Sequence, residues 1–330
     1  MTSKMRLCLF VFFSVTLAMA VEPSLPPETA ALLKRGNDEY LAGKYQDAAR
    51  DYSEAVKDSH ETCRLCLEGL ALSKARLGDA SASLKLADKA LGLAATPMHK
   101  ASAHNCKGEI CLMYANTDPK KLTEAETEYR AVAELIPNNS ATQFRLGYVL
   151  LREKKVDEGV ALLNSFVISH PAGPDAELAK KLIAHPAHAG NEFAPSFSFK
   201  TAQGVPIDST ALQGKVVVFD FWATWCPSCR ASVPELRDLS KRYPAEKLVI
   251  VSISEDSKPA DWSDFIARKH MDWNQYLDEK GQSAKAFGIH AFPTYIIMDS
   301  DGAIVQRIVG MDPRESLGHR LREELATMIK

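Results

Sequence analysis

The sequence has little excess of either charge, no long apolar run and, in its first half, few clusters of β-branched residues. Each of these absences argues against a class of fold or function. Charge is balanced, with 40 Lys and Arg against 42 Asp and Glu in 330 residues, so no electrostatic feature predicts a nucleic-acid partner. No apolar run reaches the roughly 20 residues that span a bilayer. Clusters of β-branched residues are nearly absent from residues 27–184, so we expect no sheet there.

The longest apolar run lies near the start of the chain, and it is too short to cross a membrane. Lys4 and Arg6 precede this run, which covers residues 7–20 and ends in Ala-Met-Ala, a small-x-small pattern. We therefore predict a signal peptide over residues 1–20, cleaved after Ala20, and a periplasmic or otherwise exported protein. An uncleaved anchor is the alternative, and the short run argues against it.

Residues 27–184 read as a series of helices with an internal period of about 34 residues. Small residues recur inside each helix hairpin, as in the unit that runs from Gly36 through Ala48 to Ala55. This pattern resembles the tetratricopeptide repeat, and a nonrepetitive helical bundle is the alternative. The resemblance implies a concave surface that docks a partner protein.

A linker rich in Pro, Ala and Gly over residues 185–190 separates this array from a different pattern over residues 191–330. There, buried strands alternate with helices, which predicts a mixed sheet flanked by helices. The expected fold class is thus an all-α repeat array followed by an α/β domain. Strands are expected at 215–221, 247–253, 294–298 and 303–309, helices at 227–242, 260–270 and from 313 onward, and a short hairpin at 197–207.

Two cysteines, Cys226 and Cys229, lie where a predicted buried strand passes into a helix. The helix start favours an anion, so a Cys226 thiolate would be stabilised, and the i, i+3 spacing there allows a disulfide. Pro227 is tolerated in the first turn. Zinc needs four ligands and no further Cys or His lies nearby, so we expect neither a metal nor a cofactor.

Three stretches around and beyond this pair form a motif set: DFWATWCPSC at 220–229, Val-Pro-Glu at 233–235 and GIHAFPT at 288–294. With them the sequence resembles the thioredoxin fold, and within it the exported TlpA/ResA-like branch of the AhpC/TSA-redoxin superfamily. The resemblance implies that Cys226 is the attacking thiol, Cys229 the resolving thiol and Asp220 the buried acid. It also implies that Pro293 is a cis-proline. Trp225, Phe292 and Thr294 would form the client-binding surface.

Asp220 also stands out by its own surroundings. It is flanked by apolar residues in a predicted buried strand, so desolvation should raise the pKa of its carboxyl and suit it to act as a base. The neighbouring strand at 247–253 has no internal lysine to pair with Asp220, and Glu255 follows it closely. The proton path is therefore expected to differ from that of thioredoxin.

These features predict a protein-disulfide oxidoreductase that reduces client protein disulfides and is recharged by a membrane electron donor. The direction of electron flow stays open, because Pro227 and Ser228 depart from the dipeptide of the branch. A disulfide-forming oxidant is one alternative. A thiol peroxidase with antioxidant activity is another, although no proline-threonine signature precedes Cys226. The alternative outside enzymology is an assembly scaffold whose second domain binds.

Four further cysteines lie in the repeat array, and their even number in an exported chain permits disulfides. Cys66 and Cys106 should fall at nearly matching heights on neighbouring helices, so we predict a structural disulfide between them. Free buried thiols, a four-cysteine zinc site and a second redox relay remain alternatives for Cys63, Cys66, Cys106 and Cys111.

Overall fold

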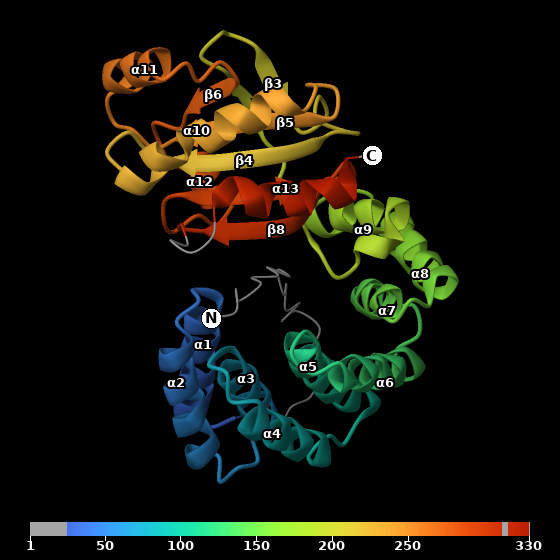
Figure 1. The fold of residues 1–330 in the computed structure, drawn as a ribbon. Coiled ribbons are helices and arrows are strands. Elements are labelled where there is room, and N and C mark those ends of the chain that lie inside the picture. Colours follow the sequence, from blue (N-terminus) through green and yellow to red (C-terminus); the bar gives the residue numbers. More distant parts are fainter. Residues whose placement is uncertain (1–24, 312–315, 330) are drawn as a thin grey trace. The chain divides into compact units, whose positions relative to one another are not determined.

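The computed structural model describes residues 25–311 and 316–329, which form two compact units divided between Gly190 and Asn191 (Figure 1). The predicted signal peptide at 1–20 lies outside the described residues. Among the described helices, none has both the length and the apolar character needed to cross a membrane.

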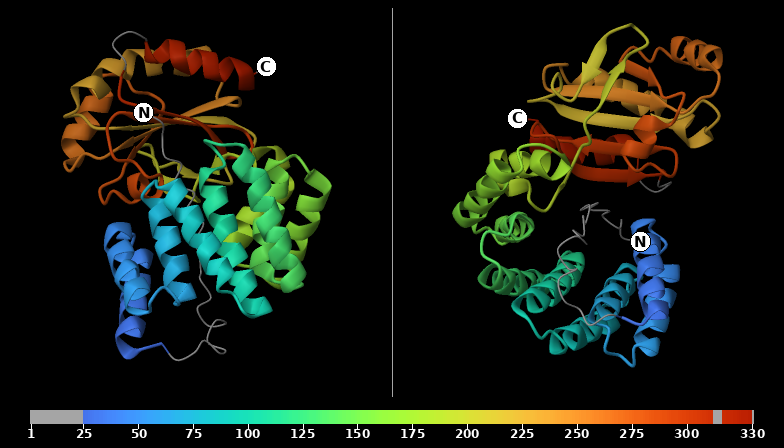
Figure 2. Two further views of the ribbon diagram at one scale, coloured as in Figure 1. Left: turned by 90° about the horizontal axis from the view of Figure 1, so that it is seen from below. Right: turned by 180° about the vertical axis from the view of Figure 1, so that it is seen from behind.

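The first unit consists of α-helices that pack in consecutive pairs, α1 with α2 through to α7 with α8, and Figure 2 shows them side by side in chain order. The expected fold class is confirmed for this half. The helices are α1 (Pro27–Leu41), α2 (Tyr45–Asp58), α3 (Arg64–Arg76), α4 (Ala80–Gly92), α5 (Pro97–Tyr114), α6 (Lys120–Leu135), α7 (Ser140–Arg152), α8 (Val156–Ser169) and α9 (Pro174–Ala184), followed by the 3-10 helix η2 (Pro186–His188).

Small residues let the helices of this unit approach closely around buried tyrosines. A Cβ atom added at Gly36 on α1 or at Gly69 on α3 would lie 2.8 or 2.5 Å from the Tyr52 ring of α2. The same arrangement recurs where Gly108 on α5 faces Tyr129 on α6, at 2.9 Å. These glycines are therefore needed for contact between helices, because any side chain would displace a ring that has no free space around it.

The second unit is built on a six-stranded sheet in the order β1-β8-β7-β4-β5-β6. β4 runs parallel to β5 and antiparallel to β7, and β2 and β3 form a separate hairpin. The strands are β1 (Glu192–Phe193), β2 (Ser198–Lys200), β3 (Pro206–Asp208), β4 (Val216–Trp222), β5 (Leu248–Ser254), β6 (Asn274–Leu277), β7 (Thr294–Met298) and β8 (Ala303–Val309), and the helices are α10 (Pro227–Arg242), α11 (Pro259–Arg268), α12 (Gln282–Ala286) and α13 (Leu317–Met328).

Both faces of this sheet are covered, which explains the unbroken apolar runs of β4 and β5. One face packs against α10, α11 and α13 in a cluster that also contains Cys226 and Cys229 (Figure 1). The other face packs against the β2–β3 hairpin and α12. Every residue of β4 and β5 is buried, so a polar side chain in either strand lies in an apolar layer. The mixed sheet flanked by helices confirms the expected fold class for this half.

The predicted disulfide between Cys66 and Cys106 is wrong. Cys66 is bonded to Cys63, with Cα atoms 5.3 Å apart, while Cys106 and Cys111 are free and buried. Cys63 precedes α3 as its N-cap, and its Sγ accepts the Cys66 N–H at 3.1 Å, so the first turn of the helix brings the two sulfurs together. Cys106 instead lies 3.7 Å from the Glu68 carbonyl oxygen. Burial raises the pKa of the Cys106 and Cys111 thiols, which makes them poor nucleophiles.

We expect Gly108→Ala to destabilise the helical unit by about 1–3 kcal/mol, because its Cβ would collide with the Tyr129 ring. Gly92→Ala is the matched control, since its Cβ meets nothing within 4 Å and alanine favours the helix. Urea unfolding followed by far-UV circular dichroism measures both. Tryptophan fluorescence follows the second unit separately, because all four tryptophans lie there. Equal midpoints for the two variants would contradict the close-packing role of Gly108.

Candidate active site

The Cys226–Cys229 pair forms a disulfide at the point where β4 passes into α10. Cys226 is the N-cap of α10 in an extended conformation, and its Sγ accepts the Cys229 N–H at 3.3 Å. Ser228 Oγ also lies 3.3 Å from Cys226 Sγ. Pro227 takes the first helical position, where its missing N–H leaves no bond unmade. A thiolate on Cys226 would therefore have two hydrogen-bond donors and the positive end of the helix beside it.

The loop before Cys226 is held by Asp256, a residue that the sequence analysis did not single out. Asp256 accepts hydrogen bonds from the Thr224 backbone N–H at 3.0 Å and the Thr224 hydroxyl at 2.7 Å. Ser254 Oγ donates to the same carboxyl at 2.6 Å, and Arg230 binds the Thr224 carbonyl from α10. These contacts fix the approach of the chain to the helix start. The sequence did offer one indication of Asp256, which is an acidic residue just after a predicted buried strand.

Asp220 lies in the middle of β4, between Ser252 of β5 and Tyr295 of β7. Its side chain is 2% exposed, and burial raises the pKa of its carboxyl from 3.8 to about 7, although the hydrogen bond from Ser252 opposes the rise. Because strand residues alternate in direction, Asp220 faces the same side as Val218 and Trp222. Those two side chains pack in the cluster that contains Cys229, so the carboxyl shares a layer with that cysteine.

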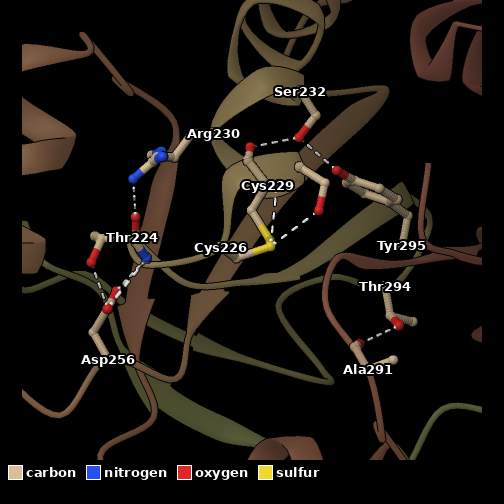
Figure 3. The surroundings of a disulfide bond; sticks show 10 residues. Thr224, Cys226, Cys229, Arg230, Ser232, Asp256, Ala291, Thr294 and Tyr295 are labelled. Carbon is tan, nitrogen blue, oxygen red and sulfur yellow. Dashed lines mark hydrogen bonds between the residues drawn. A yellow bond between two sulfur atoms is a disulfide. The ribbon is translucent and has the colours of Figure 1, made fainter. Parts of the chain in front are cut away.

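The hydroxyl groups of Tyr295 and Ser232 link β7 to the backbone of Cys229. Tyr295 donates to Ser232 Oγ at 2.7 Å, and Ser232 donates to the Cys229 carbonyl at 2.8 Å. Figure 3 shows this pair on one side of the disulfide, opposite Thr224, Arg230 and Asp256. Sequence reasoning missed both hydroxyls, because neither belongs to a motif near Cys226.

The Phe292–Pro293 peptide bond is cis and directly precedes β7. Phe292 packs edge-on against Trp225 with ring centroids 5.9 Å apart, and Trp225 is 61% exposed. These two predicted binding residues are thus brought together at the surface beside Cys226. Thr294 differs from them because its side chain is buried and its hydroxyl donates to the Ala291 carbonyl at 2.7 Å.

Glu255, the acid noted soon after the strand at 247–253, lies beside Asp278. Its backbone N–H binds the Trp222 carbonyl at 3.1 Å. Burial, and then the neighbouring carboxyl of Asp278, raises the pKa of the Glu255 side chain. Asp278 in turn accepts three backbone N–H groups, from Gln282, Ser283 and Ala284. Across residues 25–311 and 316–329, no three His, Cys, Asp or Glu side chains come together in a way that could hold a metal ion.

Comparison with known proteins agrees with this geometry. The sequence profile of the Redoxin family matches residues 188–323, and a tetratricopeptide repeat profile matches residues 33–97. The thiol-disulfide oxidoreductase ResA of Bacillus thuringiensis subsp. konkukian is 27% identical over 130 residues, which are 39% of this chain and 75% of that protein. The thioredoxin-like protein YneN of Bacillus subtilis is 33% identical over 133 residues, 39% of this chain and 76% of that protein.

Among solved structures, a thiol-disulfide oxidoreductase from Bacteroides fragilis is 27% identical and has a TM-score of 0.36, covering 40% of this chain and 99% of that one. The Redoxin match covers the unit that carries the cysteine pair. The chain therefore belongs to the redoxin family as a ResA-like thiol-disulfide oxidoreductase of thioredoxin fold, with tetratricopeptide repeats before its catalytic domain.

Proposed function

We propose that this protein reduces disulfide bonds in client proteins through the Cys226–Cys229 dithiol. The observation that carries the proposal is the buried carboxyl of Asp220, which has one oxygen without a hydrogen bond among the described residues and lies in the same layer as Cys229. Cys229 is 2% exposed, so its thiol needs a nearby base to become a nucleophile. A carboxyl whose pKa is about 7 can take that proton at neutral pH.

The reaction follows from these positions. The Cys226 thiolate attacks one sulfur of the client disulfide, which forms a mixed disulfide and releases the first client thiolate. Asp220 accepts the Cys229 proton, and the Cys229 thiolate then attacks Cys226 Sγ. The bond between Cys226 and the client breaks, the second client thiolate leaves, and the Cys226–Cys229 disulfide forms. Two electrons pass from the dithiol to the client.

Client binding is assigned to the surface beside Cys226. The exposed Trp225 and the half-buried Phe292 offer an apolar surface, and the cis peptide bond at Pro293 ends the loop next to them. An extended client segment could lie against these rings while its disulfide meets Cys226. The buried Thr294 contributes through its bond to Ala291, which supports the loop.

We also propose that the chain works outside the cytoplasm. The Cys63–Cys66 disulfide supports this location, because disulfides persist in oxidising compartments. Every turnover leaves Cys226 and Cys229 oxidised, so the cycle needs a second dithiol, which we assign to an electron donor in the membrane. The helical repeats would dock one of these protein partners, as stacked repeats offer extended surfaces to polypeptides.

A disulfide-forming oxidant is the second candidate, and one observation favours it. Cys226 Sγ lies within 3.3 Å of both Cys229 N and Ser228 Oγ. Both groups can donate to a thiolate, which stabilises the reduced pair and raises its potential. The same Asp220 carboxyl, in its protonated form, would then return a proton to Cys229 as that thiolate leaves.

The equilibrium potential of Cys226–Cys229 separates these two functions. In a titration against glutathione we expect a potential of about −270 mV, close to that of thioredoxin. A potential of about −120 mV would identify an oxidant. The C226S/C229S variant supplies the baseline for Cys63–Cys66 and the two free thiols.

Asp220 should also make stability depend on pH. Its pKa of about 7 in the folded chain exceeds the value of 3.8 for free aspartate, so between these values the folded state holds a proton that the unfolded state has released. The free energy of unfolding therefore falls as the pH rises from about 4 to 7, by about 4 kcal/mol in all. We expect D220N to be more stable than the wild type at pH 8 by an amount approaching this, and equally stable at pH 4.

Urea unfolding at both pH values, followed by tryptophan fluorescence, measures this difference. The matched control is D256N, which alters a buried carboxylate that accepts hydrogen bonds from Thr224 and Ser254, so it should lower stability at pH 8. A D220N variant no more stable than the wild type at pH 8 would show that Asp220 is not desolvated as described.

A further inference from the structure

The Asp220 carboxyl is reached by a hydrogen-bond chain that begins on another part of the sheet. Trp273 Nε1 donates to Ser252 Oγ at 2.8 Å, and Ser252 Oγ donates to Asp220 Oδ2 at 2.7 Å. The three side chains are buried, with 8%, 0% and 2% of their surfaces exposed in that order. Ser252 is the parallel-strand neighbour of Asp220, while Trp273 directly precedes β6.

The direction of this chain is determined by its first member. An indole N–H can only donate, so the Ser252 oxygen has to act as its acceptor. The single hydroxyl hydrogen of Ser252 is then directed to Asp220 Oδ2. That oxygen accepts a hydrogen bond whether the carboxyl is ionised or neutral. The exchangeable proton of Asp220 is thereby confined to Oδ1, which has no hydrogen-bond partner among the described residues.

The remaining polar neighbours of Asp220 are engaged elsewhere. Tyr295, its neighbour on β7, gives its hydrogen to Ser232, and the Glu255 carboxyl, which follows β5, lies beside that of Asp278. Of the ionisable groups on α10, Cys229 lies in the same apolar layer, Glu235 accepts the Gly318 N–H of α13 and Arg237 donates to the Lys269 carbonyl. The others, Arg230, Asp238, Lys241 and Arg242, are exposed. Cys229 is thus the ionisable group in this layer that is left to exchange a proton with Oδ1.

We propose that Trp273 and Ser252 are positioning residues that hold Asp220 Oδ2 as a permanent acceptor and so reserve Oδ1 for proton exchange with Cys229. This inference rests on the proposed function for its reaction step, the transfer of the Cys229 proton to Oδ1. Ser252 occupies the neighbouring strand position and stabilises the carboxylate by a hydrogen bond rather than by a positive charge.

The chain offers a matched control for the role of Trp273. Trp262 on α11 packs in the same apolar cluster and is also 8% exposed. Its Nε1 has no hydrogen-bond partner among the described residues. W262F and W273F therefore remove similar packing, but only W273F removes a donor from the relay.

The test is the pKa of Asp220 in the oxidised full-length protein, read from the carboxyl stretch in infrared spectra and assigned by difference from D220N. S252A deletes the hydrogen bond to the carboxylate, so the pKa should rise by about one unit, and W273F should raise it by less. S252T keeps the hydroxyl and should restore the wild-type value. W262F should leave the value unchanged. The pH profile of client-disulfide reduction should shift in the same direction for S252A.

An unchanged Asp220 pKa in both S252A and W273F would overturn the relay, as would an equal shift in W262F and W273F. A shifted pKa without a shifted pH profile would overturn the link to Cys229. The infrared measurement needs no client and no reduced cysteine, so it decides the relay even if the electrons flow in the direction of an oxidant. A failure of the proposed function would instead be seen in the potential of Cys226–Cys229.

Discussion

The desolvation of one carboxyl group in the central strand is the constraint on which the catalytic unit depends. β4 is covered on both faces, so Asp220 has no access to water and its charge is disfavoured. The same covering layers bury Cys229 and bring α10 against the sheet. A fold that stabilised this carboxylate fully would be more stable at neutral pH, but under the proposed function it would leave the buried Cys229 thiol without a base.

The site combines this buried acid with a rigid helix start. Asp256 accepts the backbone and side-chain donors of Thr224, and Arg230 reaches back to the Thr224 carbonyl. The loop is thus held from β5 and from α10, and Cys226 is presented at the N-cap with little freedom. Trp225 is exposed and packs edge-on against the half-buried Phe292, so the two rings form an apolar surface next to a buried pair of sulfurs.

The elements of the catalytic unit could be predicted from the sequence where the residues that determine them are close together in the chain. The unbroken apolar runs predicted β4 and β5, and α10 has the expected bounds because Cys226, Pro227 and the following periodicity are all local. β1, β6 and α12 escaped prediction because they are short and take their structure from neighbouring elements. The bond from Ser252 to Asp220 joins residues 32 apart, and it became visible only once the strand register was known. The Cys66–Cys106 prediction failed although the signal was local, because the Cys63–Cys66 pair within one helical turn was considered only as a redox relay and not as the disulfide.

Both disulfides of the described chain join cysteines three residues apart, each across the first turn of a helix. A bridge of this kind closes a very small loop, so it removes little entropy from the unfolded chain. It also limits mispairing, because the six cysteines of the described residues would have fifteen possible connectivities if all of them paired at random. Each bridge finds its partner within its own segment. Correct oxidation of the chain therefore does not depend on the order in which the repeats and the sheet assemble.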